Sequence, residues 1–234
     1  MPDERREHLI RFYSILDSLE ENIGGARRLA ACTGRMEWPA RGVYFFQEPG
    51  ETRTDTGGGP RIVLVGAHST YSGASRRLWD RLREHKGESE TGGGDHRSSV
   101  FRNMVGAALI RRSGPDVPSW GKARTVKKDV RIAEHPLERE VSRVIGNMPF
   151  LWLPMGDASG PGSRGNILRN SIALLSNYHR PRLDPPSPDW LGDYCISDRV
   201  RKSGLWNSSL VDGGYDPAFL DNLYWLVAVT GKAS

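Results

Sequence analysis

Cysteine is scarce in this chain of 234 residues, and long apolar runs are absent. The two cysteines, Cys32 and Cys195, lie far apart with no partner at metal-ligand spacing, so we expect both to be reduced and buried. No apolar run approaches the roughly 18 residues of a membrane-spanning helix, and the first residues lead into no secretory signal. These absences argue against a disulfide scaffold and an integral membrane protein, and we expect a cytoplasmic one.

A strong excess of one charge is also missing overall, but charge is concentrated locally. The formal net charge is +5. Residues 76–131 hold 14 Lys or Arg against 7 Asp or Glu, a balance of +7, so the rest of the chain sums to −2. Such an excess favours binding to a polyanion through counterion release, although a solvated face that keeps a protein soluble carries the same charge. Charge alone leaves both interpretations open.

Length and composition predict one well-filled core with extensions. Apolar residues make up 37% of the chain and charged residues 26%, which is typical of a folded protein. Apolar residues at helical spacing predict a helix over residues 4–22, and a short helix could follow over 26–32. β-branched and aromatic runs at 42–47 and 61–66 predict a hairpin with a long loop.

The remaining pattern predicts an α+β fold with a small three-stranded central sheet flanked by helices. Three further helices are expected over residues 75–86, 135–146 and 166–178, and a third strand over 150–153. Two more helices are expected to begin at a cap, one at Asp95 or Ser98 and the other at Asp216-Pro217. We divide the chain into an N-terminal helical arm (1–37), a core (38–180) and a C-terminal extension packed on that core (181–234).

Three side chains in this order suggest phosphodiester chemistry. Tyr44 lies on one end of the apolar strand predicted over 42–47, and Arg81 and His85 lie one turn apart on a single helix face. Taken singly, Tyr44 is more often a core or edge-strand aromatic, and Arg81 and His85 an exposed helix pair. Their combination with the local basic excess favours a nuclease-type site, because Arg binds phosphate with a planar, permanently charged fork.

The order Gly42-Val43-Tyr44, Val65-Gly66 and Arg81-xxx-His85 resembles the GIY-YIG nuclease superfamily, most of all its restriction-endonuclease branch. The resemblance runs from about residue 38 to 180. It implies hydrolysis of a DNA phosphodiester with one Mg²⁺ or Mn²⁺, in a restriction or antiviral defence role. The implied partner is double-stranded DNA, and whether a homodimer cuts both strands is left open.

The resemblance also implies roles for individual residues. Tyr44 would be the general base or would orient the attacking water, Arg81 would bind the scissile phosphate, and His85 would hydrogen-bond the tyrosine or relay its proton. Where the family's second motif carries a tyrosine this chain has Leu64, and Tyr71 is the candidate replacement. The other expected contributors are the late asparagine, assigned to Asn177 with Asn170 as the alternative, and the DNA-contacting His96, Arg97, Ser98 and Arg102.

One departure from the family bears directly on activity. Its metal-binding glutamate aligns with Leu168, and a leucine cannot bind Mg²⁺, which prefers oxygen ligands. Either the register is wrong, or another acid such as Glu138, Glu140 or Asp157 substitutes, or catalysis is impaired. The hypotheses are therefore a metal-dependent DNA endonuclease, a nuclease-derived DNA-binding module acting in a larger assembly, and an interaction module that uses neither DNA nor metal.

Overall fold

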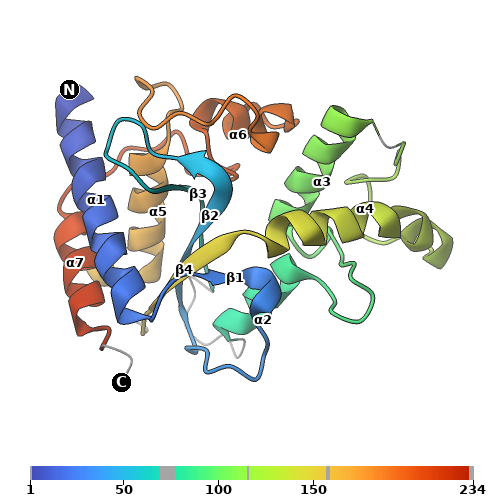
Figure 1. Ribbon diagram of the computed structural model, residues 1–234, viewed down its shortest axis with the longest axis horizontal. Coiled ribbons are helices and arrows are strands. Elements are labelled where there is room, and N and C mark those ends of the chain that lie inside the picture. The colour runs from blue at the N-terminus through green and yellow to red at the C-terminus, as the bar shows by residue number, and fades with distance from the viewer. Residues whose placement is uncertain (1, 69–76, 115, 157–158, 232–234) are drawn as a thin grey trace.

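The computed structural model describes residues 2–68, 77–114, 116–156 and 159–231 (Figure 1). Within these residues one antiparallel sheet has four strands in the order β1-β4-β2-β3. The strands are β1 (Arg27–Arg28), β2 (Gly42–Thr52), β3 (Pro60–Ala67) and β4 (Pro149–Pro154). The α+β class and the central hairpin are confirmed. The sheet has one strand more than predicted, because the two residues of β1 are too few to show a period.

The hairpin places the first motif against the second. Tyr44 lies opposite Gly66 on β3 and opposite Trp152 on β4, and it is buried. A Cβ on Gly66 would lie 2.2 Å from the Tyr44 ring, so only glycine allows this ring to cross the neighbouring strand. Residues 48–52, predicted as loop, continue β2.

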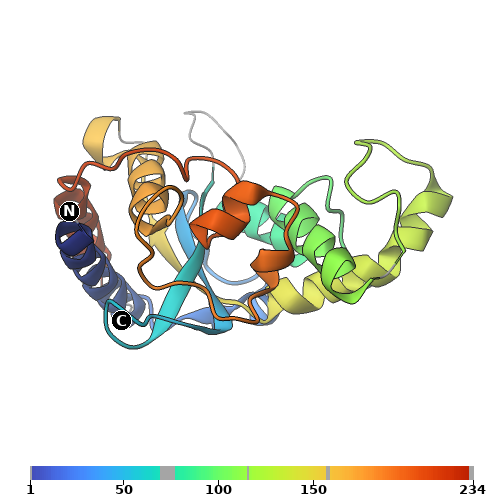
Figure 2. The ribbon, with the colours of Figure 1, turned by 90° about the horizontal axis from the view of Figure 1, so that it is seen from above.

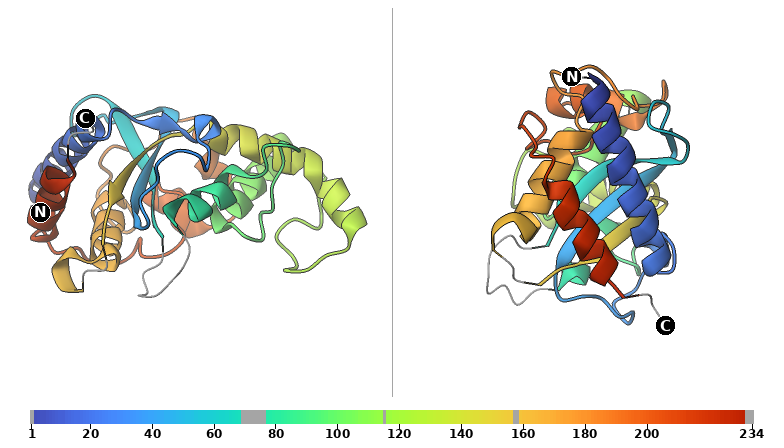
Figure 3. Two further views of the ribbon diagram at one scale, coloured as in Figure 1. Left: turned by 90° about the horizontal axis from the view of Figure 1, so that it is seen from below. Right: turned by 90° about the vertical axis from the view of Figure 1, so that its left-hand side faces the viewer.

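Two groups of helices flank the sheet (Figure 1). On one side α1 (Pro2–Asn22) and α7 (Phe219–Val229) lie side by side next to α5 (Arg164–Leu175), as Figure 3 also shows. Buried Arg5 donates hydrogen bonds to the last carbonyls of α5, Leu174 O at 3.0 Å and Ser176 O at 2.9 Å. These contacts satisfy a helix end that would otherwise lack partners.

The other side holds α2 (Leu78–Lys86), α3 (Val100–Ser113) and α4 (Lys128–Gly146). In Figure 2 the first turns of α4 extend away from the sheet. The C-terminal extension adds α6 (Asp198–Ser203), and single 3₁₀ turns occur at Leu29–Ala31, Gly160–Gly162 and Leu191–Tyr194. One hydrophobic core joins buried side chains from all three predicted segments, and the boundaries at 37 and 180 stay a prediction.

Several predicted helix limits were wrong for local reasons. The segment 26–32 forms β1 and a 3₁₀ turn instead of a helix. The cap of α3 is Ser99, whose Oγ accepts the Arg102 N–H at 3.2 Å, in place of Asp95 or Ser98. The last helix begins after Pro217, at Phe219. None of the described helices combines the length and apolarity needed to cross a bilayer.

Candidate active site

A hydrogen-bonded chain links three elements at the centre of the site. The Tyr44 hydroxyl on β2 lies 2.9 Å from His85 Nε2 on α2, and His85 Nδ1 lies 2.7 Å from Ser99 Oγ at the start of α3. Ser99 Oγ already accepts the Arg102 N–H, which leaves its own proton free to donate to Nδ1. The imidazole then carries its proton on Nε2 and donates it to the Tyr44 oxygen. In the other tautomer the Tyr44 hydroxyl donates to Nε2, and Nδ1–H donates to Ser99 Oγ. The expected contact between Tyr44 and His85 is therefore present.

Tyr44 and His85 are both uncharged at neutral pH. Burial raises the pKa of the Tyr44 phenol, and the charge of Arg81 only partly opposes that rise. Burial, followed by the charges of Arg81 and Arg102, holds the pKa of His85 well below its ordinary value. Both shifts oppose proton transfer from the phenol to the imidazole. The pair is thus neutral in the free protein, and an ionised Tyr44 requires additional positive charge in the pocket.

The depressed pKa of His85 predicts a pH-dependent stability. As pH falls below about 6.5 the unfolded chain takes up a proton at this residue while the folded chain does not, so the free energy of unfolding should fall by up to about 1.4 kcal/mol per pH unit. Above the unfolded pKa the contribution is constant. Urea unfolding of the wild type and of His85→Asn between about pH 5 and pH 8 measures it. Identical pH dependence in the two proteins would contradict the assignment.

Arg81 places a permanent positive charge beside the hydrogen-bonded chain of Tyr44, His85 and Ser99. Its Nη1 donates to Glu84 Oε2 at 2.6 Å and to the Ser98 carbonyl at 3.2 Å, and the guanidinium lies close enough to Tyr44 to oppose the rise in the pKa of the phenol. The Arg81 side chain is 32% exposed, so part of the fork faces solvent. An anion beside Tyr44 would meet this partly desolvated cation, where charge-assisted hydrogen bonds are strong.

A cavity of about 260 Å³ collects these groups. Its walls come from β2, β3, α2, α3, α5 and the segment after α6. The lining includes Tyr44, Gly66, Arg81, His85, Phe101, Met104, Leu168, Ile172, Asn207, Ser208 and Ser209. Leu168 therefore lines the same cavity as Tyr44.

The described lining of this cavity does not fit a divalent metal. Mg²⁺ and Mn²⁺ sites are built from carboxylate and other hard oxygen ligands, and none of the described lining residues carries a carboxylate. Leu168, which we aligned with the family's metal-binding glutamate, contributes only methyl groups to this cavity. Both ends of the Asn207 amide bond the backbone of Val65. Two of the predicted candidates, Tyr71 and Asp157, lie outside the described residues.

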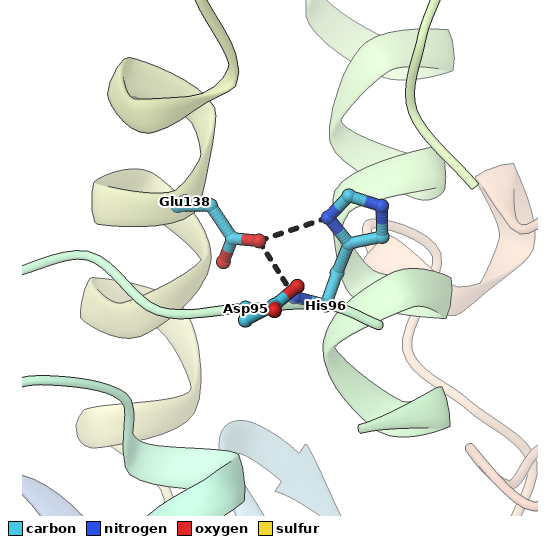
Figure 4. Close-up of side chains that lie close together, drawn as sticks. All are labelled: Asp95, His96 and Glu138. Atoms are coloured by element: carbon cyan, nitrogen blue, oxygen red, sulfur yellow. Dashed lines mark hydrogen bonds and ion pairs between the residues drawn. The ribbon is translucent and has the colours of Figure 1, made fainter. Parts of the chain in front are cut away.

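Glu138 and Glu140, the predicted substitutes, do not line the cavity. Glu138 is buried between α4 and the 95–102 segment, where Oε1 accepts His96 Nδ1–H at 2.9 Å and Oε2 pairs with Arg102 Nη2 at 2.5 Å (Figure 4). Glu140 forms a partly exposed pair with Arg143. The geometry therefore does not support either as the replacement ligand.

Asp95, His96 and Glu138 place three ligand-type atoms within 4.8 Å of one another (Figure 4). His96 Nε2 accepts the Gly121 N–H at 3.1 Å, so the imidazole proton lies on Nδ1 and is donated to Glu138. The second Glu138 oxygen faces the Arg102 guanidinium. Because every ligand-type atom of His96 and Glu138 is engaged and a cation stands beside them, the cluster is a structural network rather than a metal site.

The residues predicted to contact DNA have other partners. Arg102 is fully buried and also donates to the His85 carbonyl at 2.9 Å, which leaves it no surface to offer a phosphate. The Arg97 fork is bidentate to Glu134 at 2.7 and 2.8 Å, and His96 is buried. Ser98 alone of the four is exposed.

The two asparagine candidates also lie outside the cavity lining. Asn177 Oδ1 accepts from Arg5 Nη2 at 3.1 Å and from the Leu183 N–H at 3.0 Å, so Asn177 fixes the start of the C-terminal extension. Asn170 accepts the Asp216 N–H at 2.8 Å and thereby holds the segment before α7.

Sequence reasoning missed the contribution of the C-terminal extension. Asn207 Oδ1 accepts the Val65 N–H at 3.0 Å, its Nδ2 donates to the Val65 carbonyl at 2.8 Å, and the Trp206 N–H donates to the Val63 carbonyl at 2.7 Å. The extension thus covers the free edge of β3 and brings Ser208 and Ser209 to the cavity. No local pattern marks this pairing, because its two halves are far apart in the sequence.

A family model described as a GIY-YIG domain matches residues 3–233. The match includes α1 and α7, beyond the 38–180 segment that carries the motifs. No curated protein and no solved structure matches the chain.

Proposed function

The chain belongs to the GIY-YIG domain family, which suggests nuclease activity, and we propose that its cavity is a DNA phosphodiester site. In this proposal the chain binds double-stranded DNA far better than it cleaves it. One observation carries the proposal: the Tyr44–His85–Ser99 chain and Arg81 share a cavity with Leu168. The phosphate-binding and proton-holding groups are kept, while the carboxylate is replaced.

The described side chains would each contact a bound phosphodiester in a different role. Arg81 offers the exposed part of its fork to a phosphate oxygen. Tyr44 presents its hydroxyl to the same group or to a water beside it. His85 fixes the Tyr44 oxygen through Nε2, and only its other tautomer, with Nδ1–H donated to Ser99, can accept the phenolic proton. Ionising an ordinary phenol at pH 7 costs about 4 kcal/mol, and the raised pKa of Tyr44 increases that cost. Without a ligand for a cation at position 168, cleavage should be slow.

A second candidate function is a metal-dependent DNA endonuclease of restriction or defence type. The intact hydrogen-bonded chain from Tyr44 to Ser99, with Arg81 beside it, favours this candidate. It predicts rapid wild-type cleavage in Mg²⁺ or Mn²⁺ that disappears in Tyr44→Phe. The first proposal instead predicts salt-sensitive DNA binding with little cutting in either metal, as a binding module within a larger assembly would show.

Arg81→Ala should weaken binding of a short DNA duplex by about tenfold or more, because it removes a charge-assisted contact to phosphate. Arg83→Ala is the matched control, since Arg83 lies exposed on the same helix but outside the cavity lining. Fluorescence anisotropy at several salt concentrations measures both. Equal affinity in the two variants would remove the cavity from the DNA-binding site.

A further inference from the structure

The positive charge of this protein is concentrated in the end of α3, the loop that follows it and the start of α4. Residues 111–131 hold seven Lys or Arg against two Asp, a balance of +5. Because the formal charge of the whole chain is also +5, the other residues sum to zero. The field that a polyanion meets at a distance therefore originates mainly from this segment.

Four of these cations, within residues 121–128, form what we call the basic loop: Lys122, Arg124, Lys127 and Lys128. All four are exposed, and none makes an ion pair or side-chain hydrogen bond with the described residues. Some exposed cations elsewhere pair with acids, as Arg199 does with Asp212 and Lys202 with Asp198. The charges of the basic loop are therefore not neutralised by the described residues and can bind an external anion.

The basic loop is held at its base by buried contacts. Trp120 is 8% exposed, stacks on His96 with ring centroids 3.8 Å apart, and donates its indole N–H to the Asn103 carbonyl at 3.0 Å. Ser119 Oγ donates to Glu134 at 2.7 Å, and the same glutamate receives the Arg97 fork. Because this end is already ordered, binding at the loop costs less conformational entropy than ordering a free tail would.

The basic loop lies on the same side of the molecule as the start of α5. In Figure 2 the segment before α4 and the N-terminal end of α5 project to the same side of the molecule, and Figure 3 shows the same from below. Leu168, in the second turn of α5, is in the wall of the cavity, as are the first residues of α3. The basic loop and the α5 wall of the cavity thus lie toward one side of the molecule, the arrangement that a long polyanion contacting both requires.

We propose that the basic loop binds the phosphate backbone of double-stranded DNA outside the cavity and sets most of the protein's non-specific affinity. This inference rests on the proposed function, because the same duplex occupies both places. It also reassigns the predicted DNA contacts: His96 and Arg97 anchor the loop, and the lysines and arginine beyond them meet the phosphates. Contacts of this kind carry no base information, so they fix position rather than sequence.

The test compares two four-site variants by anisotropy with a short duplex over a salt series. One replaces Lys122, Arg124, Lys127 and Lys128 with Gln. The control replaces four exposed cations far from the loop, Arg6, Arg11, Arg28 and Arg35, with Gln and removes the same net charge. Each lost phosphate contact should lower the slope of log affinity against log salt by about 0.9, so the loop variant should lose about 3 to 4 and the control less than about 1.

The outcomes separate this inference from the proposed function. A loop variant that keeps the wild-type slope, while the wild type binds DNA, would overturn the inference alone. A wild type that does not bind the duplex even at low salt would overturn both. Circular dichroism melting of each variant shows whether the fold is intact, and a loop variant that melts like the wild type but loses the salt slope supports the proposal. A stronger effect on an RNA duplex than on DNA would also count against it.

Discussion

Leu168→Glu is expected to increase the rate of Mg²⁺-dependent DNA cleavage by about a hundredfold or more. The substitution places a carboxylate in the cavity that already holds Tyr44 and Arg81. A hard oxygen ligand there would let the cavity bind a divalent cation, whose charge lowers the pKa of nearby oxygens and stabilises a developing phosphate charge by several kcal/mol. Each 1.4 kcal/mol is about tenfold in rate, which gives the expected size.

Two matched substitutions make this test specific. Leu168→Gln has the same length without the charge, and Arg169→Glu adds a carboxylate one residue further along on the exposed face of α5. Neither should cleave faster than the wild type. Adding Tyr44→Phe to Leu168→Glu should abolish the gain, because the new activity depends on the phenol. A Leu168→Glu protein that cuts no faster than Leu168→Gln would show that position 168 is not the missing part of the site.

The centre of the site could be predicted because its signals are local. The strands that carry Tyr44 and Gly66 show β-branched and aromatic runs, and Arg81 and His85 fall one helical turn apart. Their contact requires only that α2 follow the hairpin closely. The structure places the Tyr44 hydroxyl and His85 Nε2 within hydrogen-bond distance, as the order of motifs suggested.

The partners of the residues around that centre could not be predicted, because a charged residue in a sequence does not reveal what it will contact. Arg102 and His96 looked like phosphate ligands at a helix start, yet Glu138, on α4, binds both of them. In the same way Asn177 looked catalytic but holds Leu183. Each pairing joins segments that only the tertiary fold brings together. A side chain that is buried in such a pairing has no surface left with which to contact DNA.

Glu138→Ala should lower the free energy of unfolding by about 3 to 5 kcal/mol, the cost of leaving a buried charge without its partner. Arg102 is fully buried against this carboxylate, and their side-chain atoms lie 2.5 Å apart. Glu140→Ala is the control: its pair with Arg143 is partly exposed, so the loss should stay below about 1 kcal/mol. Urea unfolding measures both without reference to activity.

A further pair of measurements separates a structural Glu138 from a metal ligand. If the carboxylate serves Arg102, replacing both partners with apolar residues, as in Glu138→Leu with Arg102→Met, should recover most of the stability that Glu138→Ala loses, because no buried charge is then left unpaired. Adding Mg²⁺ or a chelator should leave the wild-type melting temperature unchanged if no cation occupies the Asp95, His96 and Glu138 cluster. A rise in that temperature with Mg²⁺ that vanishes in Glu138→Ala would instead assign the cluster to a cation. The network through Arg102 to the His85 carbonyl would then couple that cation to the cavity.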